Sequence, residues 1–386
     1  MSAALADMPV IDVDAHFTEP PDFWTSRAPA KYRDQAPRVV KGANGNPVWV
    51  VGADLTLSPP GLCVVQPDGR KVYGKFSIET FEGMTPAAFD CEARLRAMDE
   101  LGLTMQILYP NVLGFAGATI MRLEDVGLRN FCTTAYNDAI ADVAKRSRGR
   151  IFPQALLPFW DVELCAKELA RCQEQLGLTG FNMTETPEQW GFPSLHHEHW
   201  DPLWREAEAR GMPCNFHVAS AGIMNNVTWQ GYSPDRLLAA LSCFLFMNNS
   251  RSMVNLIFSG LLDRYPHMKF VSVESGIGWI PFVLEACEYQ MAENMVNRGG
   301  LKLTPKEYFQ RNIFASYWFE KHRTREDIEA IGADNVMFET DFPHPTCLYP
   351  GVREHVQASL GALAPAVQRK VLYENAVRVY QLPSPV

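Results

Sequence analysis

Short hydrophobic runs alternate with longer segments of helical periodicity along most of this chain. The runs are rich in β-branched and aromatic residues and predict eight strands, at residues 10–16, 104–109, 151–157, 179–182, 213–217, 269–274, 312–316 and 336–340. Between them, hydrophobic positions three or four residues apart predict helices, for example at 91–101, 161–176 and 280–296. A strand followed by a helix, repeated eight times, is typical of a closed parallel barrel. We therefore expect an α/β protein built on a (β/α)8 TIM barrel.

The segment from residue 20 to residue 88 interrupts this pattern. It is rich in proline, glycine and aromatic residues and has little helical periodicity. Strand-like stretches at 47–57 and 71–76 flank a Pro-Asp-Gly turn at 67–69. Because a long ordered insertion in a compact domain is usually functional, we expect one domain, 1–386, in which 20–88 is an inserted cap or lid after the first strand. A contact between subunits is the alternative.

Composition narrows the class of partner. The chain of 386 residues is 47% hydrophobic and carries a net charge of −9, which argues against a nucleic-acid surface. Its first residues lack a secretion signal, and its apolar runs are shorter than the roughly 20 residues that span a membrane. Nine scattered cysteines without a C-x-x-C pair fit a reducing compartment. We expect a cytoplasmic protein that binds a small molecule and neither nucleic acid nor membrane.

Candidate metal ligands follow four of the predicted strands. Asp14 and His16 end the first, His217 the fifth, Glu274 the sixth and Asp341 the eighth. Parallel barrels place active sites at the carboxyl ends of their strands, so these side chains should converge on a divalent cation. The alternatives are that Asp14 and Asp341 cap turns, that His16 is an ordinary buried residue, and that Glu274 binds backbone amides near Gly276. Asp12 is expected on the same face as Asp14, as buried support.

Further polar residues could also contribute to the site or to the loops around it. His196, His197 and His199 form the most histidine-rich stretch, but no strand fixes them, so we expect a loop with at most one histidine turned inward. His344, three residues after Asp341, is either a turn residue or a contact to the metal ligands or the substrate. Asn111, which follows the second strand, is expected to line the pocket.

Four motifs together resemble one enzyme group. They are D-V-D-A-H followed by E-P-P-D-F-W, then N-F-H-V, R-Y-P-H-M-K-F-V-S-V-E-S-G and E-T-D-F-P-H-P. This combination resembles the amidohydrolase-related family of the amidohydrolase superfamily, in the branch of the aminocarboxymuconate-semialdehyde and hydroxybenzoate decarboxylases. The resemblance implies a distorted TIM barrel, a divalent ion held by Asp14, His16, His217 and Asp341, and a homodimer.

Two positions depart from that family pattern. Asp14 stands where many relatives have histidine, and Glu274 stands where the decarboxylases have a catalytic histidine. The extra carboxylate favours Zn, Mn or Fe, as one ion with room for a second, and makes Glu274 either a fifth ligand or an acid/base group. Asp341 is expected to accept a proton from a water molecule bound to the ion. His217 is expected to be a catalytic residue as well as a ligand.

The expected reaction is metal-dependent hydrolysis or non-oxidative decarboxylation of a small carboxylated or carbonyl-bearing compound. Glu274 leaves both reactions open, because the histidine that it replaces is expected to position or protonate the substrate of the decarboxylases. Two alternatives remain. One is an Fe- or Mn-dependent oxygenase on the same barrel, and the other is a partner subunit, complexed with a related chain, that keeps a structural ion.

Overall fold

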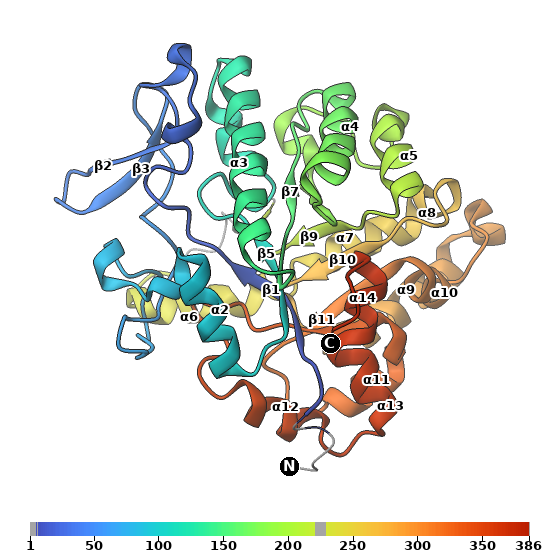
Figure 1. Ribbon diagram of the computed structural model, residues 1–386. Coiled ribbons are helices and arrows are strands. Elements are labelled where there is room, and N and C mark those ends of the chain that lie inside the picture. The colour runs from blue at the N-terminus through green and yellow to red at the C-terminus, as the bar shows by residue number, and fades with distance from the viewer. Residues whose placement is uncertain (1–4, 6, 221–228, 386) are drawn as a thin grey trace.

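A closed ring of parallel strands forms the centre of the molecule, with helices around it (Figure 1). The computed structural model describes residue 5, residues 7–220 and residues 229–385. The strand order is β6-β5-β1-β12-β11-β10-β9-β8-β7, and every pair is parallel. The two ends of this order, β6 (Ile151–Pro153) and β7 (Ala155–Leu156), are separated in the chain only by Gln154. The sheet therefore returns to the strand on which it began, which confirms the predicted (β/α)8 barrel.

All eight predicted strand positions contain a strand. Besides β6 and β7, the barrel strands are β1 (Ile11–His16), β5 (Met105–Tyr109), β8 (Phe181–Asn182), β9 (Cys214–His217), β10 (Phe270–Val273), β11 (Ile313–Tyr317) and β12 (Val336–Phe338). The third predicted strand is divided because its first half pairs with β5 and its second half with β8. β10 and β12 are shorter than predicted. β10 ends at Val273 because Glu274 has a left-handed backbone conformation, with φ of 56°. Asp341, three residues beyond the end of β12, is also left-handed, with φ of 59°.

Helices cover the outside of the barrel. They are α2 (Cys91–Leu101), α3 (Val126–Arg146), α4 (Val162–Arg171), α5 (Asp201–Arg210), α6 (Pro234–Leu245), α7 (Asn249–Phe258), α8 (Leu261–Arg264), α9 (Ile280–Asn294), α10 (Pro305–Asn312), α11 (Thr324–Ile331), α12 (Val352–Leu360), α13 (Pro365–Arg369) and α14 (Asn375–Tyr380). Asp90, Asp125 and Asp161 begin α2, α3 and α4 by accepting a hydrogen bond from a backbone amide of the first turn. No helix among the described residues is long and apolar enough to cross a membrane.

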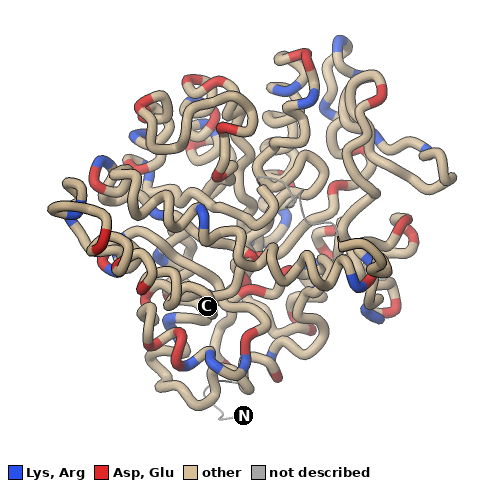
Figure 2. The backbone as a smooth tube through the Cα atoms, turned by 180° about the vertical axis from the view of Figure 1, so that it is seen from behind, with Lys and Arg blue, Asp and Glu red and all other residues tan. Residues whose placement is uncertain are grey.

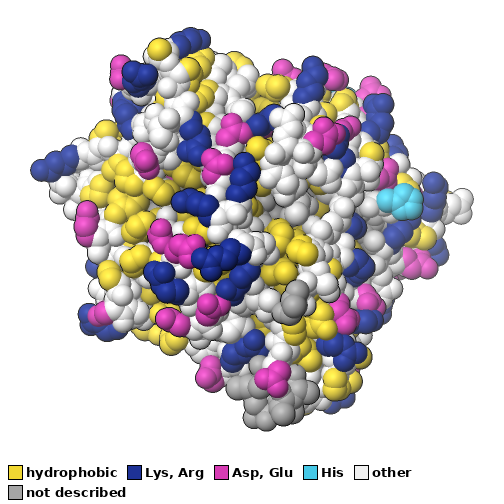
Figure 3. Space-filling view, in the orientation of Figure 1, with side chains coloured by type: hydrophobic (Ala, Val, Ile, Leu, Met, Phe, Trp, Pro, Cys, Tyr) yellow, Lys and Arg dark blue, Asp and Glu magenta, His cyan; other side chains and the backbone are white. Residues whose placement is uncertain are grey.

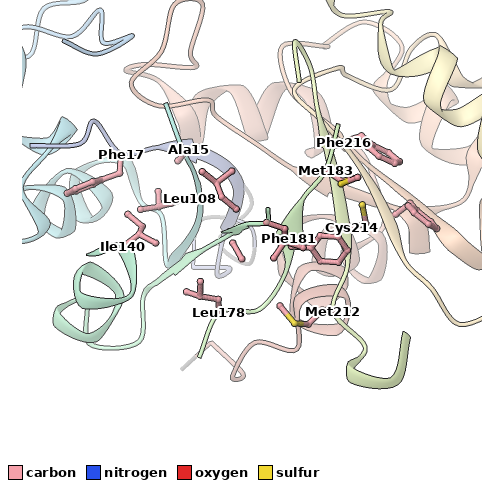
Figure 4. Close-up of a cluster of buried hydrophobic side chains, with 14 of the residues drawn as sticks. Ala15, Phe17, Leu108, Ile140, Leu178, Phe181, Met183, Met212, Cys214 and Phe216 are labelled. Carbon is pink, nitrogen blue, oxygen red and sulfur yellow. The ribbon is translucent and has the colours of Figure 1, made fainter. Parts of the chain in front are cut away.

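The hydrophobic core has two parts. The larger lies between the barrel and its helices, and Figure 4 shows a portion of it around Phe17, Leu108 and Phe181. The smaller fills the barrel interior, where residues such as Ile11 and Val271 meet α14. Charged residues of both signs are interspersed over the outer helices and loops (Figures 2 and 3).

The inserted segment carries its own small sheet and packs on α3. Its strands are β2 (Arg38–Lys41), β3 (Pro47–Val51) and β4 (Leu55–Thr56), arranged antiparallel. Trp24 donates a hydrogen bond to the carbonyl of Cys132 in α3 at 2.9 Å, and Arg27 pairs with Asp142 of the same helix at 2.7 Å. That this segment acts as a cap or lid stays a prediction.

One predicted strand of the insertion is wrong. The Pro-Asp-Gly turn forms, with a hydrogen bond of 2.9 Å from the amide of Gln66 to the carbonyl of Arg70. Residues 71–76, however, contribute only an isolated bridge between Val65 and Lys71. Gly74 takes a φ of 69°, which takes the backbone out of the extended conformation soon after that bridge.

Candidate metal centre

Six side chains meet at the carboxyl end of the barrel. Asp14 and His16 come from β1, His217 from β9, Glu274 from the end of β10, and Asp341 and His344 from the loop after β12. The structure thus brings all five predicted site residues together and adds His344. Each of the six is buried.

A bulge in β1 aims its two donors into the barrel. Asp12 is opposite Gln106 and Ala15 is opposite Leu108, so β1 contains one residue more than β5 over this interval. Asp14 and His16 therefore face the interior, whereas Asp12 faces outward and accepts hydrogen bonds of 2.8 Å from Gln106 Nε2 and from the amide of Thr340. Asp12 is buried support, as expected, but the prediction that it shares a face with Asp14 is wrong because of the bulge. Burial raises its pKa to about 7.

The donor atoms lie close enough to share one ion. Nε2 of His16 is 3.1 Å from Nε2 of His217. Oδ1 of Asp14 is 3.4 Å from the first of these nitrogens and 3.5 Å from the second. Oδ1 of Asp341 is 3.5 Å from His16 Nε2. Nδ1 of His217 lies 2.9 Å from the carbonyl oxygen of Val218, which can only accept, so Nδ1 carries the proton and the lone pair of Nε2 faces the cluster.

The carboxylates of the two aspartates lack hydrogen-bond partners among the described residues. All four carboxylate oxygens of Asp14 and Asp341 are buried and make no hydrogen bond to the described residues. Burial raises the pKa of both carboxyl groups and lowers the pKa of His16, because each charged form loses its hydration. A divalent cation would compensate the buried carboxylates and use the free lone pairs of the histidines. The residues present therefore fit a divalent metal ion.

Glu274 lies beside His217, on the other edge of its ring. Its Oε2 is 3.5 Å from His217 Nδ1, and burial raises its pKa to about 8. The alternative that its carboxylate binds amides near Gly276 is not observed, because the amide of Ile277 donates to Oε1 of Glu320 at 2.6 Å.

Sequence reasoning missed Glu339 of the β12 segment. Its Oε2 accepts hydrogen bonds from the hydroxyl of Ser316 and from the amide of Glu274, the latter at 3.0 Å. It therefore holds the left-handed backbone of Glu274 in place. The only available signal was an acidic residue within a buried strand, two positions before Asp341.

The histidine-rich stretch lies outside this cluster. His197 accepts a hydrogen bond of 3.1 Å from the amide of His199 and so begins the short helix Glu198–Trp200. The ring of His199 packs against Trp200 with centroids 4.8 Å apart. None of the three histidines belongs to a group of metal-binding side chains among the described residues.

The sequence of this chain is similar to those of two known decarboxylases. The gamma-resorcylate decarboxylase of Polaromonas sp. is 27% identical over 271 residues, covering 65% of this chain and 76% of the relative. The 2-amino-3-carboxymuconate-6-semialdehyde decarboxylase of Dictyostelium discoideum is 24% identical over 226 residues, covering 54% and 55%.

Solved structures and a family model complete the comparison. An amidohydrolase from Mycobacterium avium subsp. paratuberculosis superposes with a TM-score of 0.73 at 21% identity, over 97% of this chain and 99% of the other. The dihydroxybenzoic acid decarboxylase of Polaromonas sp., solved with manganese and 2-nitroresorcinol, gives a TM-score of 0.62 at 18% identity, over 97% of each chain. The family model described as amidohydrolase matches residues 11–382. The predicted resemblance is confirmed, and the chain belongs to this amidohydrolase family.

Proposed function

We propose that this protein is a metal-dependent, non-oxidative decarboxylase of small aromatic carboxylic acids. The observation that carries the proposal is the buried group of donor side chains in which Asp14, His16, His217 and Glu274 meet and Asp341 lies 3.5 Å from His16. The carboxylates of its two aspartates make no hydrogen bond to the described residues. Relatives named as gamma-resorcylate and aminocarboxymuconate-semialdehyde decarboxylases support carboxylate removal as the reaction. The decarboxylase structure with manganese supports that metal as the ion.

Four side chains would hold the ion: Asp14, His16, His217 and Asp341. A divalent ion there would supply Lewis-acid chemistry, attracting a carboxylate or phenolate oxygen of the substrate. The fixed tautomer of His217 keeps its lone pair available for this purpose. The bulge in β1 keeps the carboxylate oxygens of Asp14 available for the ion. It turns this side chain away from Thr340 and Gln106, which donate hydrogen bonds to Asp12.

Glu274 is the group that we assign to proton transfer. In the metal-free protein, burial raises its pKa to about 8, which favours the protonated carboxylic acid over the carboxylate. In the proposed step this proton moves to the ring carbon that bears the carboxylate, the bond between the two carbons breaks, and its electron pair stays on the ring as carbon dioxide leaves. A proton from solvent then restores Glu274. The residue would thus replace the histidine of the related decarboxylases.

An aromatic wall supports a flat substrate. The ring of Phe115 lies 4.0 Å from the ring of His217 and 5.2 Å from that of His16, measured between centroids. Phe115 is only partly buried, in contrast to the fully buried histidines that it covers. An aromatic acid bound beside the ion can therefore stack on this ring.

The test is turnover of a panel of hydroxybenzoates, beginning with 2,6-dihydroxybenzoate, by protein reconstituted with Mn²⁺. The proposal predicts release of carbon dioxide and, in heavy water, one deuterium on the product carbon. A Glu274→Gln variant should bind the metal normally and lose turnover by about 10²-fold or more. Solvent ¹⁸O in the product would indicate hydrolysis instead, and consumption of dioxygen would indicate an oxygenase. A homodimer, or a complex with a related subunit, stays a prediction.

A further inference from the structure

Arg94 of α2 is a fully buried arginine next to the backbone of the metal-binding cluster. Its Nε donates a hydrogen bond to the carbonyl oxygen of Ala87 at 2.6 Å, and one terminal nitrogen donates to the carbonyl oxygen of His16. The other terminal nitrogen donates to Oε1 of Gln106 at 3.2 Å. The planar guanidinium thus binds three acceptors at once, and one of them is the backbone of a proposed metal ligand.

Gln106 extends these contacts to Asp12. Its Nε2 donates to Oδ2 of Asp12 at 2.8 Å. The carboxylate of Asp12 in turn accepts hydrogen bonds from the amide of Asp14 at 3.2 Å and from the amide and hydroxyl of Thr340 at 2.8 and 2.6 Å. Asp14 is a proposed ligand, and Thr340 directly precedes another, Asp341. Two side chains therefore connect the guanidinium to the backbone of both aspartates.

Phe342 provides a shorter path to Asp341. The guanidinium carbon of Arg94 lies 4.8 Å from the centre of the Phe342 ring, which is a cation–π distance. The carbonyl oxygen of Phe342 accepts a hydrogen bond from the amide of His16 at 2.8 Å, and the amide of Asp341 donates to the carbonyl oxygen of Asp14 at 2.8 Å. β1 and the loop after β12 are thus joined by their backbones, and Arg94 contacts both.

The contacts of Arg94 are with backbone and supporting side chains and not with the donor atoms. A space-filling role would be served by an apolar side chain, without the cost of burying a cation. We propose that Arg94 is a positioning residue of the metal centre, which fixes β1 against the loop after β12 so that Asp14, His16 and Asp341 converge. This inference rests on the proposed metal-dependent function.

The test measures Co²⁺ binding by metal-free wild-type protein, Arg94→Met and Arg94→Lys. Competition with a chelator gives the affinity, and the visible absorption spectrum of bound Co²⁺ reports on the arrangement of its ligands. Arg94→Met cannot donate a hydrogen bond, so we expect it to weaken binding by about 100-fold and to alter the spectrum. Arg94→Lys keeps the charge but not the fork of donors, and should weaken binding by about 10-fold.

Arg353→Met is the matched control. Arg353 also donates to two backbone carbonyls, those of Met8 at 2.9 Å and Gly102 at 2.6 Å. These acceptors lie before β1 and at the end of α2, away from the carboxyl ends of the strands. The control should lower the melting temperature and leave the affinity for Co²⁺ and the spectrum unchanged. All measurements are made well below the melting temperature of each variant.

The outcomes separate this inference from the proposed function. If the wild-type protein binds no Co²⁺, the proposed function is overturned. If it binds Co²⁺ and the two Arg94 variants, folded by circular dichroism, keep the wild-type affinity and spectrum, only the positioning role is overturned. An equal loss of affinity in Arg353→Met also overturns that role. If neither Arg94 variant folds, Gln106→Met decides, because it interrupts the connection to Asp12 and an unchanged affinity and spectrum would contradict the positioning role.

Discussion

The two halves of the barrel interior, built from the same strands, are opposite in character. The half away from the metal-binding side chains, called the lower half, is an apolar cluster closed by α14. Its tyrosine hydroxyls are paired, because Tyr380 donates to Oδ1 of Asn215 at 2.9 Å and its hydroxyl lies 3.2 Å from that of Tyr109. The upper half, at the carboxyl ends of the strands, collects carboxylates and imidazoles, and the carboxylate oxygens of Asp14 and Asp341 make no hydrogen bond to the described residues. One or a few residues along a strand separate the two, as from Val273 to Glu274 and from Met337 to Asp341.

This difference indicates a division between stability and binding. Glu274 and Asp341 take left-handed backbone conformations, which cost on the order of 1–3 kcal/mol each in residues other than glycine. The neighbouring carboxylates add mutual repulsion and lost hydration. Apolar burial in the lower half offsets these costs. Substitutions in the upper half should therefore affect activity, and those in the lower half should affect stability.

The largest effect is expected from Asp341→Ala. Turnover of the Mn²⁺-loaded enzyme should fall by at least about 10³-fold, since the variant loses both a ligand and a proton acceptor. Because the substitution removes a buried carboxylate that receives no hydrogen bond from the described residues, the melting temperature of the metal-free protein should stay the same or rise. A loss of melting temperature as large as that of a core variant would contradict the division between the two halves.

Met337→Ala should show the converse behaviour. Met337 is fully buried in the lower cluster, so the truncation should lower the free energy of unfolding by about 2–5 kcal/mol. Urea denaturation measures this loss. Activity per folded molecule should change less than twofold, and a much greater change would show that the lower half also controls the site.

The pH dependence of the metal-free protein should come from the upper half. Burial raises the pKa of Glu274 from 4.5 to about 8, so its protonated form stabilises the fold below pH 4.5 and this contribution is lost as the pH rises through 8. Between these values Glu274 should lower the free energy of unfolding by about 1.4 kcal/mol per pH unit. Glu274→Gln should remove the contribution of Glu274 to the slope and leave that of Asp14 and Asp341, whose pKa burial also raises. Saturating Mn²⁺ should reduce the slope in the wild-type protein. An unchanged slope in the variant would assign the dependence to other groups.

The smallest effect is expected from Tyr380→Phe. It removes one hydroxyl and leaves Oδ1 of Asn215 without this donor, which should cost about 1–2 kcal/mol of unfolding free energy. Calorimetry of the metal-loaded protein would detect it as a lower melting temperature, while turnover should be unaffected. A loss of turnover comparable with that of Glu274→Gln would show that the two halves are coupled.

The sequence predicts the barrel well because short runs rich in apolar residues alternate regularly with segments of helical periodicity. It also predicts that Asp14, His16, His217, Glu274 and Asp341 lie close together, since each stands at the end of a predicted strand. That they hold a metal ion stays a prediction. It fails where the answer depends on pairing between segments. The bulge that separates Asp12 from Asp14 is defined only by the register with β5. The orientation of His344 depends on Asn111, which lies 233 residues earlier in the chain.

Anomalous diffraction from crystals soaked in Mn²⁺ tests the central claim most directly. The account predicts one strong anomalous peak at the carboxyl end of the barrel, within coordination distance of Asp14, His16, His217 and Asp341. The same peak should be absent from an Asp14→Ala/Asp341→Ala double variant that keeps the fold. A wild-type map without a peak among these side chains, or with the ion bound elsewhere, would contradict the account.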